Sequence, residues 1–190
     1  MSVESLIKER RSIRKFADRD VPKPFLYKLF HQSAGLCDPQ MLKSMRLMVA
    51  LRRESKERLS RYMMDALSGT RMGKLVPRPL KDTMGKYFSE VPGLLVVTVE
   101  NHGSKEQREN QYGQVCFFLQ NLQLVAWEQQ LGMFWRTDEM LYTKPFLDQL
   151  GVTDRERLVG ILFFGFIDKV PRPRKRTPAA KRWRCWPQIE

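Results

Sequence analysis

Three arginines and a serine stand within five residues near the amino terminus, at Arg10, Arg11, Ser12 and Arg14. Guanidinium groups hold phosphate through paired, charge-assisted hydrogen bonds, and a hydroxyl adds a further donor. Each such bond contributes on the order of 1.5–3 kcal/mol. The alternative is that these arginines follow a short helix and complement the negative end of its dipole, and spacing alone favours that simpler interpretation. The cluster is therefore a candidate phosphate site that needs support from the rest of the chain.

A second basic group lies in the carboxyl-terminal stretch 168–190. This stretch combines proline, two tryptophans and a dense run of lysine and arginine, so it cannot form a regular central element. We expect one folded domain at 1–170 and an extended or disordered arm at 171–190. Within the arm, Arg174 and Arg176 form a basic pair that is either a ligand contact or part of a solvated tail.

The 190-residue chain carries a formal net charge of +13. Such a charge calls for an anionic partner, which includes nucleic acid, acidic lipid and phosphate-bearing ligands. Arginine and tryptophan alternate in 172–186, where guanidinium and indole groups can engage phosphates and bases. A nucleic-acid-binding protein therefore remains open, although we rank it last because a uniformly basic chain is often only a basic chain.

Few residues suit metal binding or nucleophilic catalysis. Cysteine occurs three times at wide spacing, at Cys37, Cys116 and Cys185, which matches neither a disulfide framework nor a zinc site. The two histidines, His31 and His102, stand in no pattern typical of a catalytic triad or a metal site. We expect reduced thiols, no metal and no catalytic acid, base or nucleophile from the protein.

The elements that must position these groups alternate along the chain. Apolar spacing and capping residues predict helices over 3–9, 24–34, 53–67, 105–131 and 143–150. Short apolar runs predict strands over 46–51, 93–99, 133–136 and 157–167. Weak periodicity with many Gly, Pro and basic residues favours a mobile lid or loop over 68–92. The fold class is therefore α+β, in one domain.

The predicted helix 105–131 is unusual because its second half is apolar on nearly every side, from Val115 to Val125. We expect Gly132 to end it. A helix with this composition needs burial all round, which either the core of a monomer or a second copy of the chain can provide.

Nothing in the sequence indicates a membrane protein. No apolar run approaches the ~20 residues that a membrane span requires. The amino terminus also lacks the apolar core of a signal peptide. We expect a cytoplasmic protein without a membrane partner.

Four segments, in the same order as in the family, resemble nitroreductase-type flavoproteins. They are RRSIRKF, VPGLLVVTVE, YGQVCFFLQNLQLVAWEQQLGMFWRT and LGVTDRERLVGILFFGFIDKVPRPRKR. The resemblance implies a central, mostly antiparallel sheet flanked by helices, a homodimer built on the long central helix, and FMN as cofactor with NAD(P)H as reductant.

The resemblance also assigns roles to individual residues. The amino-terminal cluster of Arg10, Arg11, Ser12 and Arg14 is implied to grip the FMN phosphate and ribityl chain, with Arg174 and Arg176 returning to the phosphate. Trp135, Arg136 and Thr137 are implied to lie beside the flavin ring, with Arg136 near its N1 and O2. The family's Ala-Pro-Ser, Asn and Gln-Pro-Trp are missing from 36–45, where Met41 stands in place of a polar flavin contact.

The function implied is an NAD(P)H:acceptor oxidoreductase. It would carry hydride or electrons through flavin to a small organic acceptor such as a nitro compound, a quinone or an enone. The altered segment 36–45 leaves a second interpretation open, a protein of the same fold that binds flavin or another ligand without turnover.

Overall fold

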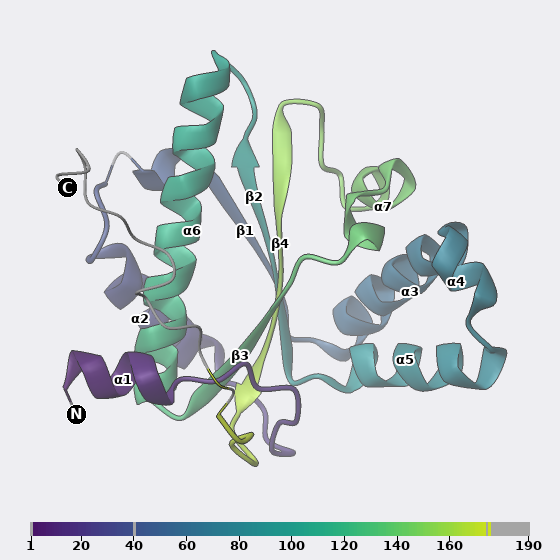
Figure 1. Cartoon of the computed structure of the whole chain (residues 1–190), viewed down its shortest axis with the longest axis horizontal. Helices are drawn as coiled ribbons and strands as arrows, with labels where there is room; N and C mark the ends of the chain where they lie inside the picture. Colours follow the sequence, from purple (N-terminus) through teal and green to yellow (C-terminus); the bar gives the residue numbers. More distant parts are fainter. Residues whose placement is uncertain (1, 40, 174, 176–190) are drawn as a thin grey trace, which may run out of the picture.

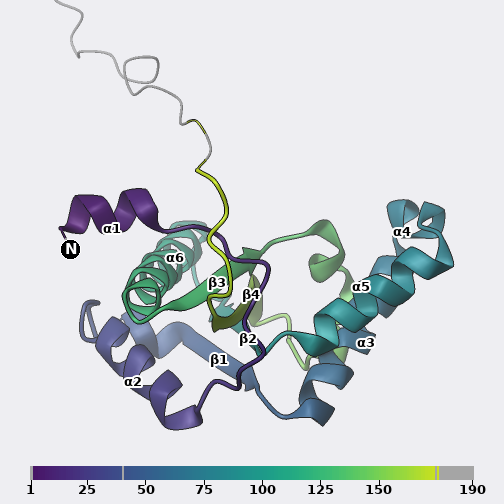
Figure 2. The ribbon, with the colours of Figure 1, turned by 90° about the horizontal axis from the view of Figure 1, so that it is seen from below.

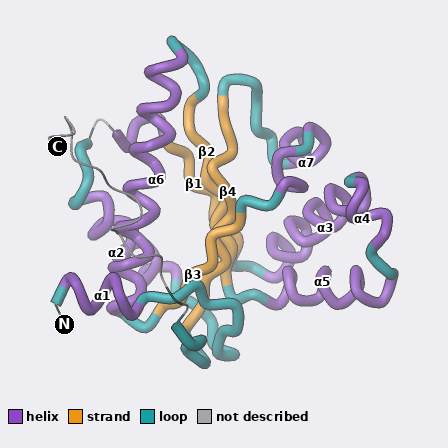
Figure 3. Tube along the Cα trace, in the orientation of Figure 1, coloured by secondary structure: helices purple, strands orange, loops and turns teal. Residues whose placement is uncertain are grey.

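The computed structural model describes residues 2–39, 41–173 and 175. A four-stranded antiparallel sheet in the order β1-β2-β4-β3 forms its middle layer. The strands are β1 (Met45–Ala50), β2 (Gly93–Glu100), β3 (Leu131–Arg136) and β4 (Glu156–Phe166). Helices cover both faces of the sheet (Figure 3). The α+β class and the antiparallel sheet flanked by helices are confirmed.

Different helices cover the two faces of the sheet. One face of the sheet packs on α2 (Lys23–Ala34) and α6 (Lys105–Glu128), with α1 (Val3–Glu9) beside α6 (Figures 1 and 2). The opposite face packs on α3 (Arg53–Gly69), α5 (Arg78–Glu90), α7 (Lys144–Gln149) and the short 3-10 helix η2 (Glu139–Tyr142). The short α4 (Arg71–Leu75) joins α3 to α5, and a further 3-10 helix, η1 (Met41–Ser44), precedes β1.

Strand β2 shows why the sheet is buried on both faces. Its side chains alternate, so that Leu95 and Val97 pack toward α6 while Leu94 and Val96 pack toward α3 and α5. All four are almost completely buried. Burial of each such side chain stabilises the fold by roughly 1.5–3 kcal/mol, and this explains the nearly continuous apolar sequence.

A β-bulge interrupts β4 at Gly160. The register against β2 shifts there, because Val97 pairs with Gly160 while Thr98 pairs with Leu158. Gly160 has a φ of 150°, and an added Cβ would lie 2.3 Å from the indole nitrogen of Trp135. That nitrogen donates a hydrogen bond of 3.3 Å to the carbonyl of Val159. The bulge therefore needs glycine and anchors the end of β3.

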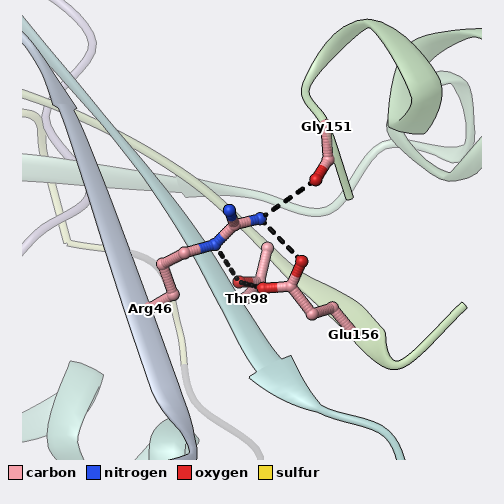
Figure 4. A network of polar contacts seen from close by, with 4 residues as sticks. All are labelled: Arg46, Thr98, Gly151 and Glu156. Carbon is pink, nitrogen blue, oxygen red and sulfur yellow. Dashed lines mark hydrogen bonds and ion pairs between the residues drawn. The ribbon is translucent and has the colours of Figure 1, made fainter. Parts of the chain in front are cut away.

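Beyond the bulge, a polar network ties three strands together (Figure 4). The guanidinium of Arg46 on β1 contacts Glu156 on β4 at 2.7 Å, and its Nη2 also donates to the carbonyl of Gly151. The hydroxyl of Thr98, which is fully buried on β2, donates to Glu156 at 3.1 Å. The network gives the buried hydroxyl of Thr98, the one polar side chain in the interior of β2, a hydrogen-bond partner. It also joins the edge strand β1 to β4.

Two local predictions were wrong. The stretch 68–92 is helical: the hydroxyl of Ser60 on α3 donates to the carbonyl of Gly85 on α5, and α5 buries Phe88 in the core. Its periodicity is weak because Phe88 is the only residue of α5 that is fully buried. Gly132 does not end the long helix, which stops at Glu128 and turns through Gln130 in a left-handed conformation (φ 59°).

The bulge yields a stability prediction. We expect Gly160→Ala to lower the free energy of unfolding by about 2–3 kcal/mol, because the new methyl group meets Trp135 and the backbone is strained. The control is Gly69→Ala at the end of α3, where nothing lies within 4 Å of the added Cβ. It should change stability by less than about 1 kcal/mol. Urea denaturation measures both, and equal effects would contradict the assignment.

Candidate functional site

The segment after α1 crosses the open edge of β3. The backbone N–H of Ile13 donates to the carbonyl of Met133 at 3.1 Å, and the N–H of Ala17 donates to the carbonyl of Phe166 at 2.9 Å. Ile13 is fully buried against Gly132, where an added Cβ would lie 2.5 Å from its side chain. The absence of a side chain at Gly132 leaves room for Ile13. This close contact places the arginines on either side of Ile13 at the sheet edge.

Arg11 makes the contact at the helix end that its sequence position suggested and also has one donor without a partner. Its Nη1 donates to the carbonyls of Lys8 and Arg10, so the side chain caps the carboxyl end of α1. Its Nε is buried without a hydrogen-bond partner among the described residues. A buried, unsatisfied guanidinium N–H is costly, and an anionic ligand would satisfy it. Arg10 is half-buried beside it, and Ser12 is exposed.

The guanidiniums of Arg14 and Arg136 both lie close to one aromatic ring, that of Phe134. The guanidinium carbon of Arg14 lies 4.1 Å from the centre of the Phe134 ring, and that of Arg136 lies 5.9 Å from it. Only 12% of the Arg136 side chain is exposed, and it also lies over Phe88 and pairs with Asp138 at 2.6 Å. Two positive charges therefore sit above an aromatic floor between β3 and α5.

Trp135 faces the other way. Its ring packs on the α6 side and closes the bulge, as described above. In an antiparallel strand, the backbone N–H and carbonyl of successive residues point alternately toward and away from the neighbouring strand. The carbonyl of Met133 points away from β4, toward Ile13, so the N–H and carbonyl of Trp135, two residues later, also point away from β4. The side chain of Trp135 is thus structural, whereas its peptide groups face the open edge. Thr137 follows directly and is exposed.

Tyr87 on α5 was missed by the sequence analysis. Its hydroxyl donates to the carbonyl of Arg14 at 3.1 Å, and its ring packs against Phe88 and Phe163. Burial raises the pKa of Tyr87, while the nearby guanidiniums of Arg136 and Arg14 partly oppose this shift. No sequence signal identified Tyr87, because it lies in a stretch without clear periodicity.

The remaining predicted site residues are not placed. Arg174 and Arg176 lie outside the described residues, and so does the side chain of Met41. Among the described residues, no group of three or more His, Cys, Asp or Glu side chains could hold a metal ion. Within the same part of the chain, no helix is long and apolar enough to cross a membrane.

Comparison with known proteins decides the family. The family model described as "Nitroreductase family" matches residues 7–166. The chain belongs to the nitroreductase family. It is 28% identical over 183 residues to "Putative NAD(P)H nitroreductase YfhC" of Bacillus subtilis (strain 168), covering 95% of this chain and 92% of that protein.

Solved structures agree with this assignment. The crystal structure of a nitroreductase-like family protein from Bacillus cereus superposes with a TM-score of 0.83 at 28% identity, covering 97% of this chain and 96% of that one. The FMN and NADPH-dependent nitroreductase NfnB from Sphigopyxis sp. strain HMH gives a TM-score of 0.76 at 16% identity, covering 98% and 100%. At that identity the second likeness shows the fold alone.

Tyr87 yields a pH-dependent prediction. Because the folded state holds the phenol proton more tightly than the unfolded state, wild-type stability should fall as the pH rises above about 10, the ordinary tyrosine pKa. Tyr87→Phe cannot ionise, so it should lose less stability over that range, although it starts about 1 kcal/mol lower at neutral pH. Thermal melts from pH 7 to about 11 measure the difference, and parallel curves for the two proteins would refute the assignment.

Proposed function

We propose that the protein is an FMN-dependent oxidoreductase that passes hydride or electrons from NAD(P)H to a small organic acceptor. A nitro compound, a quinone and an enone are the acceptor classes. The observation that carries the proposal is the group of Arg11, Arg14 and Arg136 at the open edge of β3, in a chain of the nitroreductase family. The curated relative is named an NAD(P)H nitroreductase, and a neighbouring structure is named FMN- and NADPH-dependent.

The residues at this edge fit a phosphate-bearing aromatic cofactor. Arg11 has a buried donor without a partner, which suits a phosphate oxygen. The outward peptide groups of Trp135 suit the polar edge of a planar ring, and Arg136 keeps a positive charge near them. We therefore assign Arg10, Arg11, Ser12 and Arg14 to the phosphate and ribityl side of the site.

When bound, FMN supplies the redox chemistry, and the chain supplies binding, orientation and electrostatics. Phe88, Phe134 and Phe163 form an apolar floor beneath the guanidinium of Arg136, and Phe134 also lies beneath that of Arg14. An apolar floor strengthens the attraction between these guanidiniums and an anionic ligand because less water screens the charges. The hydroxyl of Tyr87 holds the backbone at Arg14 and so orients this side of the floor.

The test has two stages. The visible absorbance spectrum of the protein, after addition of FMN and desalting, should show retained flavin. NAD(P)H oxidation should then depend on added acceptor, assayed with one nitro compound, one quinone and one enone. Absence of retained flavin would refute the cofactor assignment, and retained flavin without turnover would refute the enzymatic one.

The arginine cluster yields a binding prediction. Arg11→Ala combined with Arg14→Ala should weaken FMN binding by at least about 100-fold, because two charge-assisted contacts are lost. The matched control is Arg19→Ala, which removes a guanidinium from a similar aromatic contact. The guanidinium carbon of Arg19 lies 4.1 Å from the centre of the Phe166 ring, the same distance as that of Arg14 from the Phe134 ring. Titration of flavin fluorescence measures the affinities. An unchanged affinity in the double variant would rule out this phosphate site.

We also propose a homodimer built on α6. The sheet side of α6 is buried, but Gly113, Phe117 and Gln120 form an exposed stripe at helical spacing, and Phe117 is 51% exposed. A second copy would cover this stripe and bury Phe117, the exposed large apolar side chain of α6. Three further points remain predictions. They are one domain at 1–170 with an arm at 171–190, a cytoplasmic location, and flavin contacts from Met41, Arg174 and Arg176.

Light scattering tests the dimer. The wild-type protein should give about twice the chain mass of 22.5 kDa. Phe117→Glu should shift it toward the monomer, because a charge would be buried in the interface. Met72→Glu on α4, which is more exposed and lies at the other end of the molecule, should leave the mass unchanged (Figure 1). A monomeric wild type would contradict the proposal.

A further inference from the structure

Three large apolar side chains are exposed close together where α4 meets α5. Met72 is 74% exposed, Leu75 is 80% exposed and Leu80 is 51% exposed. Met72 and Leu75 are three residues apart and so lie on one face of α4, while Leu80 is in the first turn of α5. We refer to residues 71–81 as the α4–α5 tip.

The tip is held in place by local contacts. The hydroxyl of Thr70 donates to the carbonyl of Leu67 at 2.7 Å and accepts from the N–H of Gly73 at 2.9 Å. Gly73 is buried so closely against α3 that an added Cβ would lie 1.7 Å from the Leu67 carbonyl oxygen. These contacts turn one side of α4 toward α3 and leave Met72 and Leu75 facing solvent. The exposure follows from a fixed backbone rather than a frayed end.

The charge of the tip has one sign. Arg71, Lys74, Arg78 and Lys81 alternate with the apolar residues along this segment, which holds no acidic residue of its own. Asp65 and Asp82 flank it, and Arg78 and Lys81 line a groove with them and with Glu57. Exposed apolar side chains interspersed with cations match a surface that is anionic outside and apolar just beneath, which is the profile of an acidic lipid headgroup layer. Nucleic acid fits less well, because methionine and leucine offer no ring on which bases stack.

The tip is also remote from the other surfaces considered above. It forms the end of the molecule's long axis, whereas α1, α2 and α6 lie at the opposite end (Figures 1 and 2). The exposed stripe of α6 that we propose as the dimer contact does not include it. The candidate flavin site lies at β3 and the carboxyl-terminal part of α5, away from the first turn of α5.

We propose that the α4–α5 tip docks the protein on an anionic lipid surface. Met72, Leu75 and Leu80 insert among the headgroups, and the four cations pair with lipid phosphates. Docking of this kind needs no membrane-spanning helix. It differs from the expectation of no membrane partner, which rested on the absence of a spanning apolar run and of a signal-peptide core.

The test is sedimentation of the full-length protein with lipid vesicles. One set contains phosphatidylcholine alone, and the other also contains about one third phosphatidylglycerol. Wild type should bind the anionic vesicles and bind the neutral ones far more weakly. The triple variant Met72→Ser, Leu75→Ser, Leu80→Ser should lose at least about tenfold in apparent affinity for the anionic vesicles, because the inserting groups are gone.

A matched control carries three serine substitutions at exposed apolar residues elsewhere, Tyr27, Leu36 and Val170. It should bind as wild type does, and circular dichroism melts confirm that both variants fold. Failure of wild type to bind anionic vesicles would overturn the proposal, as would equal binding by the tip variant. A smaller assembly of the tip variant in light scattering would assign the tip to protein contact instead. These readouts need no flavin, so they stand apart from the proposed activity.

Discussion

The contact of Ile13 with Gly132 is the constraint on which the candidate site depends. It brings a segment from the amino terminus onto the last strand in the sheet order, where the Ile13 N–H pairs with the Met133 carbonyl. Side chains on either side of Ile13 then necessarily lie at that edge, Arg11 toward α1 and Arg14 above Phe134. A larger residue at 132 would push the segment away and separate the guanidiniums.

The site also depends on the helical layer that carries α5. Tyr87 connects α5 to the backbone at Arg14, and Phe88 contributes to the aromatic floor beneath Arg136. The same layer extends through Ser60 and Gly85, which join α3 to α5. Side chains of the candidate site and core side chains therefore share one packed unit, so that loss of core packing at α5 would displace Arg14 and Arg136.

The molecule has two ends with different surfaces. At one end, α6 presents a stripe that a second copy can cover, and at the other the α4–α5 tip presents apolar groups among cations. The two proposals give the positive charge separate local roles at the sheet edge and at the tip. A net charge of +13 need not indicate one large anionic partner.

The sequence by itself determined the four strands, most of the helices and the resemblance to the family. Strands such as 93–99 and 157–167 are buried on both faces and therefore read as continuous apolar runs, and the arginine cluster could be recognised because its members are neighbours in the chain. Helices α4 and α5 could not be predicted, because α5 buries little and its Tyr87 acts on a residue 73 positions away. The role of Gly132 also depends on a distant partner, Ile13. Only the tertiary structure decided these points, since local propensity carries no information about which distant backbone a side chain meets.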